Sequence, residues 1–474
     1  MADDALDRHD VQGLVVRGYG GLPAARYLLA AIDEPAGARA WLRRLADEVN
    51  PGNESAGDEA VNVALTSAGL RALGLPARIG TRFSREFIDG MTEPHRRRIL
   101  GDVDENAPER WLWGGPDGDE VHLLLLVFAR HERTLADATR RHEEAMRQGG
   151  IRPLRALDTA PLEDREHFGF VDGVSQPRLA GLGGDDALHT IQDGEVVLGY
   201  RNEYRRFTPR PLVPAADDPQ GLLAVDAAGS GDRDLGRNGA YLVMRQLSQD
   251  VLGFWEFCER ATARPDGSPD ERARVWLAAK LVGRWPSGAP LVLAPEEDRP
   301  DLRDANDFGY FHEDRHGLRC PLGAHVRRAN PRDSLDPHPG TARSVAVNKR
   351  HRLLRRGRKY GSLVGLDDLL SAGTDTQWRD DDRGLHFICL VANLSRQFEF
   401  VQHSWLGDPR FDALYDHPDP LLGPEPAGGR TFSVPADPVR RRYTDLPRFV
   451  AVRGGAYFFL PGLRALRYLA ALPG

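Results

Sequence analysis

One histidine, His325, stands in a segment whose residue types could hold an iron-containing cofactor. Over residues 319–332 the chain reads Arg-Cys-Pro-Leu-Gly-Ala-His-Val-Arg-Arg-Ala-Asn-Pro-Arg, so small residues precede the histidine and three arginines follow it. An imidazole with little bulk beside it can ligate the iron of a flat tetrapyrrole, and nearby cations can hold the carboxylates of that ligand. Arg327 and Arg328 are our candidates for these cations. The simpler alternative is an ordinary histidine near a turn.

Two further segments place ionisable side chains among glycines. In residues 167–177 (His-Phe-Gly-Phe-Val-Asp-Gly-Val-Ser-Gln-Pro), Gly169 and Gly173 lie on either side of Asp172. Glycines let a backbone approach a flat ligand closely and would aim the carboxylate at a fixed point. Residues 351–361 read His-Arg-Leu-Leu-Arg-Arg-Gly-Arg-Lys-Tyr-Gly. A plain Asp-Gly turn and a solvated basic loop are the simpler interpretations, and a single arginine that points inward would suffice for the functional one.

The composition is that of an ordinary globular protein. A length of 474 residues predicts two or three core-forming units. Apolar residues make up 41% of the chain and charged residues 28%. The net charge of −7 provides no global attraction for nucleic acid. The clusters of arginine therefore need a local explanation.

Cysteine usage and the first residues bear on the compartment. Cys258, Cys320 and Cys389 are far apart in the sequence, which argues against a disulfide framework and a cysteine-based zinc site. The acidic residues 1–7 lack the basic and apolar parts of a secretory signal. No apolar run approaches the roughly 20 residues of a membrane span. We therefore expect a cytoplasmic protein that does not interact with membranes.

The elements that must position these residues occur twice in the same order. In the first half, apolar runs predict strands at 61–66, 121–129 and 151–159, and a strand or helix at 26–32. Helical spacing predicts helices at 35–49 and 134–147, with a short helix at 67–73, and residues 11–18 predict a strand or loop. In the second half we expect strands at 241–247 and 384–392, a strand or hairpin at 449–460, and helices at 253–263, 272–285 and 394–406.

This order predicts an α+β fold of two ferredoxin-like halves, with antiparallel sheets and peripheral helices. We expect an N-terminal domain at residues 1–225, which carries the Asp172 loop, and a C-terminal domain at residues 226–474, which carries His325. The stretch 181–239, rich in Gly, Asp, Pro and Arg, is a long connection. The pocket should lie mainly in the C-terminal half.

Taken in order, the motifs resemble the dye-decolorizing (DyP-type) family of haem peroxidases. Gly169–Gly173 matches the family signature G-x-x-D-G, His325–Arg332 matches H-x-R-x-x-N-P-R, and residues 354–361 are similar to its later arginine-glycine segment. Similar stretches at 10–13, 17–20, 396–402 and 453–461 extend the resemblance over nearly the whole chain. Arg358 and Lys359 depart from the family, whose members often carry an apolar residue and proline there.

The resemblance implies one haem b per chain and a peroxidase that uses hydrogen peroxide to oxidise dyes, phenols and other aromatic reductants through an oxoferryl intermediate. It makes His325 the iron ligand and Asp172 the acid–base group that moves a proton between the peroxide oxygens. Arg355 becomes the cation that stabilises the departing oxygen, with Arg356 and Arg396 as competing candidates. The residues expected at the cofactor are Gly169, Phe170, Val171, Gly173, Gln176, Arg327, Arg328 and Arg396.

Three further expectations concern the surroundings of this site. A carboxylate should accept the second ring N–H of His325, and Asp408, Asp412 and Glu399 are candidates. Because the ordinary pKa of an aspartate is near ~4, we expect turnover to favour mildly acidic conditions. Reductants too large for the pocket could react at surface radical sites, for which Trp378, Trp405 and Tyr443 are candidates.

Other classes of function agree less well with the sequence. The chain has no G-x-S-x-G elbow of a serine hydrolase, and Gly18–Gly21 does not give the G-x-G-x-x-G spacing of a dinucleotide site. The alternatives are a haem protein with catalase-like or oxygen-transfer chemistry, a haem-carrying or haem-sensing protein, and an interaction module without haem. A haem carrier needs neither Asp172 nor Arg355. The sequence leaves the oligomeric state open, and a homo-oligomer is compatible with it.

Overall fold

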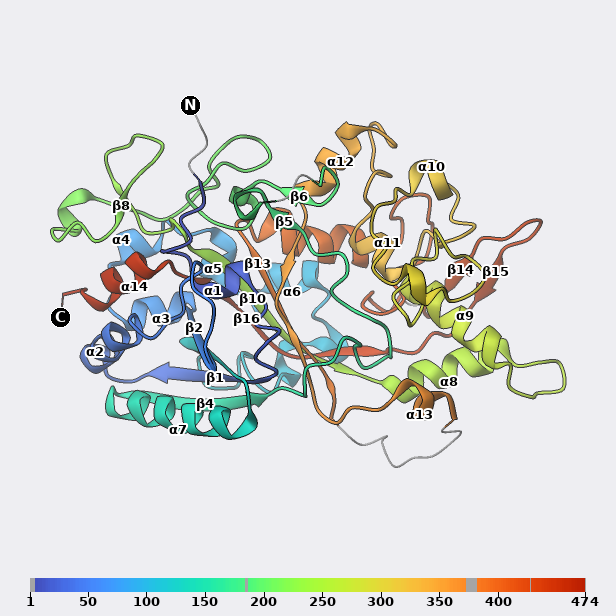
Figure 1. Cartoon of the computed structure of the whole chain (residues 1–474), viewed down its shortest axis with the longest axis horizontal. Helices are drawn as coiled ribbons and strands as arrows, with labels where there is room; N and C mark the ends of the chain where they lie inside the picture. The colour runs from blue at the N-terminus through green and yellow to red at the C-terminus, as the bar shows by residue number, and fades with distance from the viewer. Residues whose placement is uncertain (1–4, 184–185, 372–381, 427, 474) are drawn as a thin grey trace.

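The computed structural model describes residues 5–183, 186–371, 382–426 and 428–473. The first four residues and Trp378, one of the candidate radical sites, lie outside this range. The molecule is elongated, with helices α2 (Pro35–Leu45), α7 (Glu132–Gln148) and α14 (Leu463–Ala470) at one end and helices α8 (Val251–Thr262) and α9 (Glu271–Val282) at the other (Figure 1). None of the helices in the described part combines the length and the apolar character that a membrane crossing requires.

One large antiparallel sheet runs through both halves of the chain. Nine strands belong to it, in the order β11-β13-β10-β16-β2-β3-β1-β4, with β12 paired to β13. Their bounds are β1 (Ala24–Ile32), β2 (Glu59–Leu65), β3 (Leu123–Ala129), β4 (Ile151–Asp158), β10 (Ala240–Gln249), β11 (Leu354–Arg355), β12 (Arg358–Tyr360), β13 (Gly384–Val391) and β16 (Val450–Leu460).

The N-terminal half has the ferredoxin-like arrangement that its sequence predicts. Its elements follow the order β1, α2, β2, β3, α7, β4, and its strands lie in the order β2-β3-β1-β4. The ambiguous run at 26–32 is a strand, and the short helix α3 (Ser67–Ala72) follows β2 as expected. The segment at 11–18 differs from the prediction, because it contains the one-turn helix α1 (Gly13–Val16) rather than a strand or loop.

The C-terminal half repeats the same topology with a long insertion. Strand β10 is followed by α8, then by β11 and β12, β13, the π-helical segments η7 (Ser395–Glu399) and η8 (Val401–Gly407), and finally β16. The strand order β11-β13-β10-β16 matches that of the first half. The predicted α+β fold of two ferredoxin-like halves is therefore confirmed. The insertion between α8 and β11 carries α9 and also α11 (His325–Ala329), which begins with the candidate ligand.

Shorter elements lie in the connections within and between these two halves. They are α4 (Ala77–Gly80), α5 (Arg85–Asp89), α6 (Pro94–Leu100), η1 (Asp104–Asn106), η2 (Pro108–Arg110), β5 (Arg178–Leu179), η3 (Ala180–Leu182), β6 (Thr190–Ile191), η4 (Asp193–Glu195), β7 (Leu212–Val213), η5 (Ala215–Asp217), β8 (Ala224–Val225), β9 (Arg233–Asp234), η6 (Pro300–Leu302), α10 (Phe311–Asp314), α12 (Ala342–Lys349), α13 (Leu366–Ser371), β14 (Phe432–Val434) and β15 (Arg441–Tyr443). The expected domain boundary at 225/226 separates β8 from β9, which pair in a small sheet. That boundary stays a prediction.

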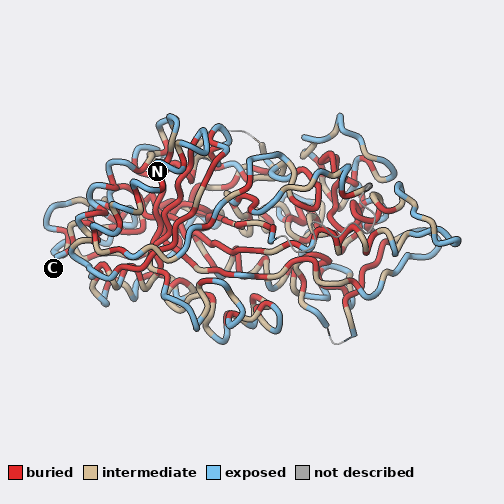
Figure 2. The backbone as a smooth tube through the Cα atoms, turned by 90° about the horizontal axis from the view of Figure 1, so that it is seen from below, coloured by how far each residue is buried: buried red, intermediate tan, exposed pale blue. Residues whose placement is uncertain are grey.

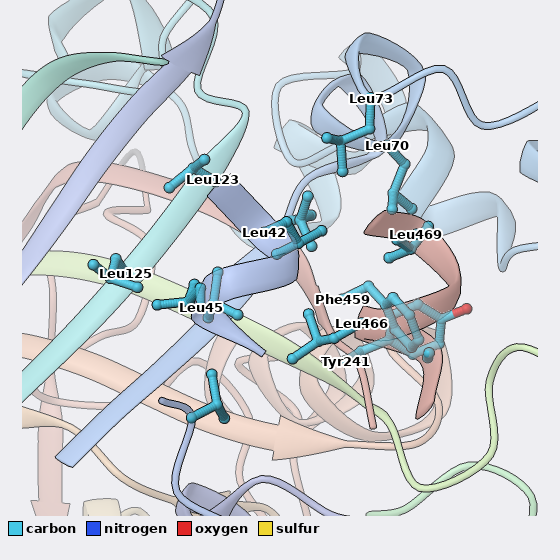
Figure 3. Close-up of a cluster of buried hydrophobic side chains, with 14 of the residues drawn as sticks. Leu42, Leu45, Leu70, Leu73, Leu123, Leu125, Tyr241, Phe459, Leu466 and Leu469 are labelled. Atoms are coloured by element: carbon cyan, nitrogen blue, oxygen red, sulfur yellow. The ribbon is translucent and has the colours of Figure 1, made fainter. Parts of the chain in front are cut away.

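Burial on both faces of the sheet explains the continuous apolar runs of its strands. In β3, Leu123 and Leu125 belong to the core on the side of α2, whereas Leu124 and Leu126 pack with the N-terminal segment on the other side. Buried segments run through the interior of the molecule, and exposed segments form its periphery (Figure 2). Leucines of α2, β3 and α14 belong to the same core cluster as Phe459 and Tyr241 of the second half (Figure 3), so that one core spans both halves.

A buried glutamine strengthens the seam between the halves. Strands β2 and β16 share only the pair Phe459 and Leu65 in the register of the sheet. Gln12 Nε2 donates to the carbonyl of Val63 at 2.8 Å and to that of Pro461 at 2.9 Å, and its Oε1 accepts the N–H of Val63 at 2.9 Å. The side chain thereby joins β2 to the residue that follows β16.

Buried histidines make the stability of the fold depend on pH. Burial lowers the pKa of His142, His167 and His386 to about 4. In an unfolded chain the pKa is near ~6.5, so the unfolded state binds more protons between these values and the free energy of unfolding falls as the pH falls. Each histidine lowers it by about 1.4 kcal/mol per pH unit within this window.

We predict that His142→Leu makes stability less sensitive to acid. His142 Nε2 has no hydrogen-bond partner within the described residues, so the replacement removes a titrating group and breaks no bond of that nitrogen. Between about pH 6.5 and 4 the unfolding of the variant should take up about one proton fewer than that of the wild type. Thermal unfolding followed by circular dichroism at several pH values tests this. His131→Leu, at the exposed start of the same helix, is the control, and equal slopes for all three proteins would contradict the prediction.

Candidate active site

A cavity lies beside the C-terminal half of the sheet. Its volume is about 280 Å³, close to the lower end of the ~300–1,000 Å³ of a common small-molecule pocket. Residues of β10, β13 and β16, of α11 and of η8 line it, together with Asp172 and its loop. Most of the lining residues follow position 226, although Leu100, Asp102 and Asn106 come from the first half.

His325 lines this cavity and is oriented by a buried carboxylate. Its Nδ1 lies 3.0 Å from Oδ2 of Asp419. The other oxygen of Asp419 accepts the N–H groups of Leu421 and Leu422 at 2.9 and 2.8 Å. The aspartate is therefore fixed, and the imidazole with it. Since Nδ1 is engaged, Nε2 is the ring nitrogen available to a ligand, and no hydrogen bond to the described residues uses it.

The charge of Asp419 survives its burial. Removal from water raises the pKa of this carboxyl, but His325, the guanidinium of Arg328 and the N–H of Leu422 outweigh that effect and leave the pKa below its ordinary value. An anion behind a metal-binding imidazole increases the basicity of the ring and fixes its orientation. Asp419 thus supplies what the sequence analysis expected from another carboxylate.

None of the three candidate carboxylates is the partner of His325, which corrects that expectation. Glu399 is paired with Arg96 at 2.9 Å and accepts the hydroxyl of Tyr457 at 2.8 Å. Asp408 accepts the N–H of Arg410 within its own turn. Asp412 is exposed, and its carboxylate makes no hydrogen bond to the ring of His325 within the described residues. Asp419 lies 94 residues from His325. No local pattern marked it in the sequence.

Asp172 and Arg355 meet at the wall of the same cavity. Arg355 Nη1 donates to Oδ1 of Asp172 at 2.9 Å, and the N–H of Gly173 donates to the same oxygen at 2.6 Å. Burial alone would raise the pKa of Asp172, but Arg355 and this N–H lower it below the ordinary value. The site therefore holds a carboxylate base and a fixed cation side by side, with His325 on the same cavity.

The two competing arginines point elsewhere. Arg356 donates to the carbonyls of Leu14 at 2.7 Å and Val15 at 3.0 Å, which anchors α1. Arg396 pairs with Glu195 at 2.7 Å, and neither arginine lines the cavity. Arg355 is therefore the arginine that accompanies Asp172.

Gln176 holds Arg355 rather than lining the cavity. Its Oε1 accepts the backbone N–H of Arg355 at 3.1 Å, and its Nε2 donates to the Arg355 carbonyl at 3.4 Å. The loop that carries Asp172 thereby also holds the backbone of its cationic partner. This placement differs from the expectation that Gln176 contacts the cofactor.

Arg327 and Arg328 also serve the chain itself, which corrects the expectation that they hold the carboxylates of a ligand. Arg327 Nη1 donates to the carboxylate of Asp314 at 3.1 Å and to the carbonyl of Cys320 at 2.8 Å. Arg328 donates to the carbonyls of His417 and Asp408 at 2.8 and 2.6 Å. Both are buried outside the cavity lining.

Other arginines line the cavity instead. Arg352 Nη2 donates to the carbonyl of Ser175 at 2.9 Å, and burial lowers its pKa to about 9, so it stays cationic at neutral pH. Arg284 Nη1 donates to the carbonyl of Gly288 at 2.6 Å. Arg245 is paired with the buried Asp102. Arg352 belongs to the basic segment noted in the sequence, whereas no signal pointed to Arg284 or Arg245.

The remaining predicted residues divide between the cavity and its surroundings. Phe170, Val171 and Gly173 line the cavity. Gly173 has a φ of +86°, and a Cβ there would project into open space. Gly169, with a φ of +94°, instead packs against Leu366, whose Cδ1 lies 2.8 Å from where a Cβ would be.

Of the candidate radical sites, Trp405 is not at the surface. It is only 4% exposed and packs edge-on against Phe400 and Phe411. Tyr443, in β15, is partly exposed and belongs to the rim of the core around α8. Trp405 therefore differs from the expectation of a surface radical site, and the role of Tyr443 stays a prediction.

The residues around the cavity fit a haem. Across the part of the chain that the structure describes, no three His, Cys, Asp or Glu side chains gather as ligands of a bare metal ion, so an iron at His325 requires further ligands from a prosthetic group. A single imidazole backed by a carboxylate is the protein contribution typical of a haem site. Leu247, Phe387 and Val401 are among the apolar side chains of the wall, and Arg284 and Arg352 are among its cationic ones.

Comparisons with known proteins agree with this geometry. No family model matches the chain. A dye-decolorizing peroxidase of Mycena epipterygia is 27% identical over 517 residues, which cover 99% of this chain and 88% of that protein. A multifunctional dye peroxidase of Amycolatopsis sp. is 30% identical, with 95% of this chain and 91% of that protein covered.

Solved structures show the same fold. An ancestral D-type dye-decolorizing peroxidase has a TM-score of 0.76 at 27% identity and covers 98% of this chain. A DyP-type peroxidase of Auricularia auricula-judae has a TM-score of 0.78 at 24% identity and covers 99% of it. These likenesses extend over nearly the whole chain and define a peroxide-dependent oxidoreductase. The chain belongs to the dye-decolorizing peroxidase family.

We predict that Asp419→Asn weakens the haem site without unfolding the protein. The amide leaves Nδ1 of His325 without an anionic acceptor, and loss of such a partner typically costs ~10–100-fold in affinity. Titration of the cofactor-free chain with haem, followed through the Soret absorption, measures the change in Kd. Asp416→Asn, an exposed carboxylate three residues earlier on the same loop, should keep the wild-type Kd. Equal affinities for Asp419→Asn and wild type would contradict the prediction.

Proposed function

We propose that this chain is a haem peroxidase that binds one haem b through His325 and uses hydrogen peroxide to oxidise dyes, phenols and related aromatic reductants. The ion pair of Asp172 and Arg355, on the same cavity as His325, is the observation that carries the proposal. Membership of the dye-decolorizing peroxidase family supports it. A cytoplasmic location and a homo-oligomeric state stay predictions from the sequence.

The roles of Asp172 and Arg355 in the reaction follow from their charges at the cavity. Haem, when bound, supplies an iron that coordinates peroxide and the capacity to store two oxidising equivalents. The ionised Oδ atoms of Asp172 can take a proton from the nearer peroxide oxygen and give it to the farther one as that oxygen leaves. The guanidinium of Arg355, held by Gln176, stabilises the negative charge on the leaving oxygen. Arginine suits this role because it stays protonated at any working pH.

The alternatives make different demands on these residues. A haem carrier or sensor needs the imidazole of His325 but has no use for a base and a cation paired on the same cavity. Catalase-like and oxygen-transfer reactions use the same proton transfer, and they differ in whether an aromatic reductant is consumed. The defining measurement is therefore peroxide-dependent oxidation of a reductant.

The experiment is steady-state oxidation of an anthraquinone dye by the haem-loaded chain, with and without peroxide. We expect turnover only with peroxide, and we expect Asp172→Asn to lower kcat/KM for peroxide by ~10²–10⁴-fold, the usual contribution of general acid–base catalysis. Asp164→Asn, an exposed carboxylate paired with Arg303 on the same loop, is the matched control. Full activity of Asp172→Asn would eliminate the carboxylate as the proton carrier.

The pH profile gives a separate prediction for Arg355. The pKa of Asp172 is lowered mainly by Arg355, which opposes the effect of burial. The carboxylate therefore loses its charge only at a pH below the ordinary aspartate pKa of ~4. Activity should therefore persist in mild acid. Removal of the cation in Arg355→Leu should raise the pKa of Asp172 and move the acid limb of kcat/KM to higher pH, with a lower plateau. The exposed Arg410→Leu is the control, and an unmoved limb in Arg355→Leu would refute the electrostatic coupling.

A further inference from the structure

A second carboxylate, Glu166, closes the loop that carries Asp172. The backbone N–H of Glu166 donates to the carbonyl of Phe170, and its carbonyl accepts the N–H of Gly169, both at 2.9 Å. Its carboxylate accepts the N–H of Phe168 at 2.9 Å through Oε2 and that of Phe170 at 3.1 Å through Oε1. One residue therefore makes four hydrogen bonds to the three residues at 168–170, immediately before Val171 and Asp172.

The sheet holds this carboxylate in place. Gln249, at the end of β10, donates from Nε2 to Oε2 of Glu166 at 2.9 Å, and its own backbone N–H donates to the carbonyl of Arg383. Glu166 and Gln249 both line the cavity. The chain of contacts thus runs from β10 through Gln249 and Glu166 to the turn that precedes Asp172.

The turn cannot shift without moving Asp172. Phe168 and Phe170 are both 3% exposed, and they pack against Phe254 and Trp255 of α8. Beyond them, the N–H of Val171 donates to the carbonyl of Pro286, and that of Asp172 donates to the carbonyl of Asp164. These contacts fix the turn and the residues that follow it. The two amides held by Glu166 therefore determine the position of the Asp172 backbone relative to the cavity.

The charges around Glu166 do not compete for its oxygens. The negative charge of Asp172 repels the Glu166 carboxylate, and the ammonium group of Lys359, on β12, attracts it. That ammonium group itself donates to the carbonyl of Arg165 and pairs with Glu163. Arg165 donates to the carbonyls of Gly169 and Pro286, and His167 bonds to the carbonyl of Tyr360. Within the described residues, the hydrogen bonds recorded for the carboxylate come from two backbone amides and one side-chain amide.

We propose that Glu166 is a positioning residue for peroxide activation, which fixes the Asp172 loop by accepting the Phe168 and Phe170 amides on its two oxygens. The inference rests on the proposed function, because it assigns Glu166 a task in the reaction of Asp172. A carboxylate suits the task because both of its oxygens accept, whereas a carboxamide turns an N–H₂ group toward one of the two amides. A misplacement of ~1 Å at a reacting group can cost about 100-fold in rate.

The test compares Glu166→Gln with the wild type in two measurements on the full chain. The first is hydrogen exchange of the Phe168 and Phe170 amides in the cofactor-free protein at pH 8, which needs no turnover. Since burial raises the pKa of Glu166 to about 7, pH 8 keeps the carboxylate ionised. The second is kcat/KM for peroxide in the haem-loaded protein at the same pH, with the Soret spectrum and the KM for the dye as checks on the cofactor and the reductant site.

We expect Glu166→Gln to exchange both amides at least about 10-fold faster and to lower kcat/KM for peroxide by about 10–100-fold, with the dye KM unchanged. Glu163→Gln, three residues earlier and 57% exposed in its side chain, should match the wild type in both measurements. Gln249→Leu removes only the hydrogen bond from β10 to Glu166 and should change both measurements in the same direction, by smaller factors. It tests the inference independently if Glu166→Gln fails to fold.

The outcomes separate this inference from the function on which it rests. A wild-type chain that loads haem but consumes no peroxide refutes the proposed function. If the wild type is active, unchanged amide exchange or unchanged kcat/KM in Glu166→Gln overturns the positioning role. A lower kcat/KM with unchanged exchange would show that Glu166 transfers protons itself, which also overturns it.

Discussion

The hydrogen bond between Asp419 and His325 is the interaction on which the site depends. A carboxylate without contact to water is costly unless it is paired and hydrogen-bonded. Asp419 meets this condition through the imidazole and the N–H groups of Leu421 and Leu422. Arg430 then holds the surrounding loop by donating to the carbonyls of Asp419 and Pro420. The hydrogen bonds that stabilise the buried Asp419 carboxylate therefore also fix the orientation of the His325 ring.

Opposite demands are met at Asp172. This side chain must be accessible from the cavity and must also remain an anion, so its stabilisation comes from one cation and one N–H rather than from complete enclosure. The cation belongs to the second half of the chain and the carboxylate to the connection that follows the first half. Their pairing therefore requires the two halves to be docked, which the shared core around Phe459 and the bonds of Gln12 ensure.

The sequence was most informative where periodicity and burial coincide. The apolar run of β3 fits only a buried strand, and the apolar spacing of α2 and α7 fits only a helix with one buried face. The repeated order of elements then predicted the two ferredoxin-like halves. Short segments were ambiguous, and α1 is a single turn whose fold is decided by its neighbours. The pairing of Asp172 with Arg355 followed from the family resemblance. Asp419 could not be predicted, because a contact across 94 residues leaves no trace in local spacing.

The misassigned arginines reveal a general property of this chain. The insertion between α8 and β11 contains little regular structure, so many of its carbonyls have no partner in a helix or sheet. Arg327 and Arg332 satisfy such carbonyls: Arg327 donates to that of Cys320, and Arg332 donates to those of Asn306 and Phe308 at 2.7 and 3.0 Å. Arg328 does the same for the carbonyls of Asp408 and His417 in the irregular segment that follows η8. A guanidinium with five N–H donors can serve several carbonyls at once. Arginines close to a ligand histidine in an irregular segment are therefore needed first for the backbone that carries the histidine. Arg284 and Arg352, which line the cavity, also donate to backbone carbonyls. Arg245, on the paired backbone of β10, instead pairs with the carboxylate of Asp102.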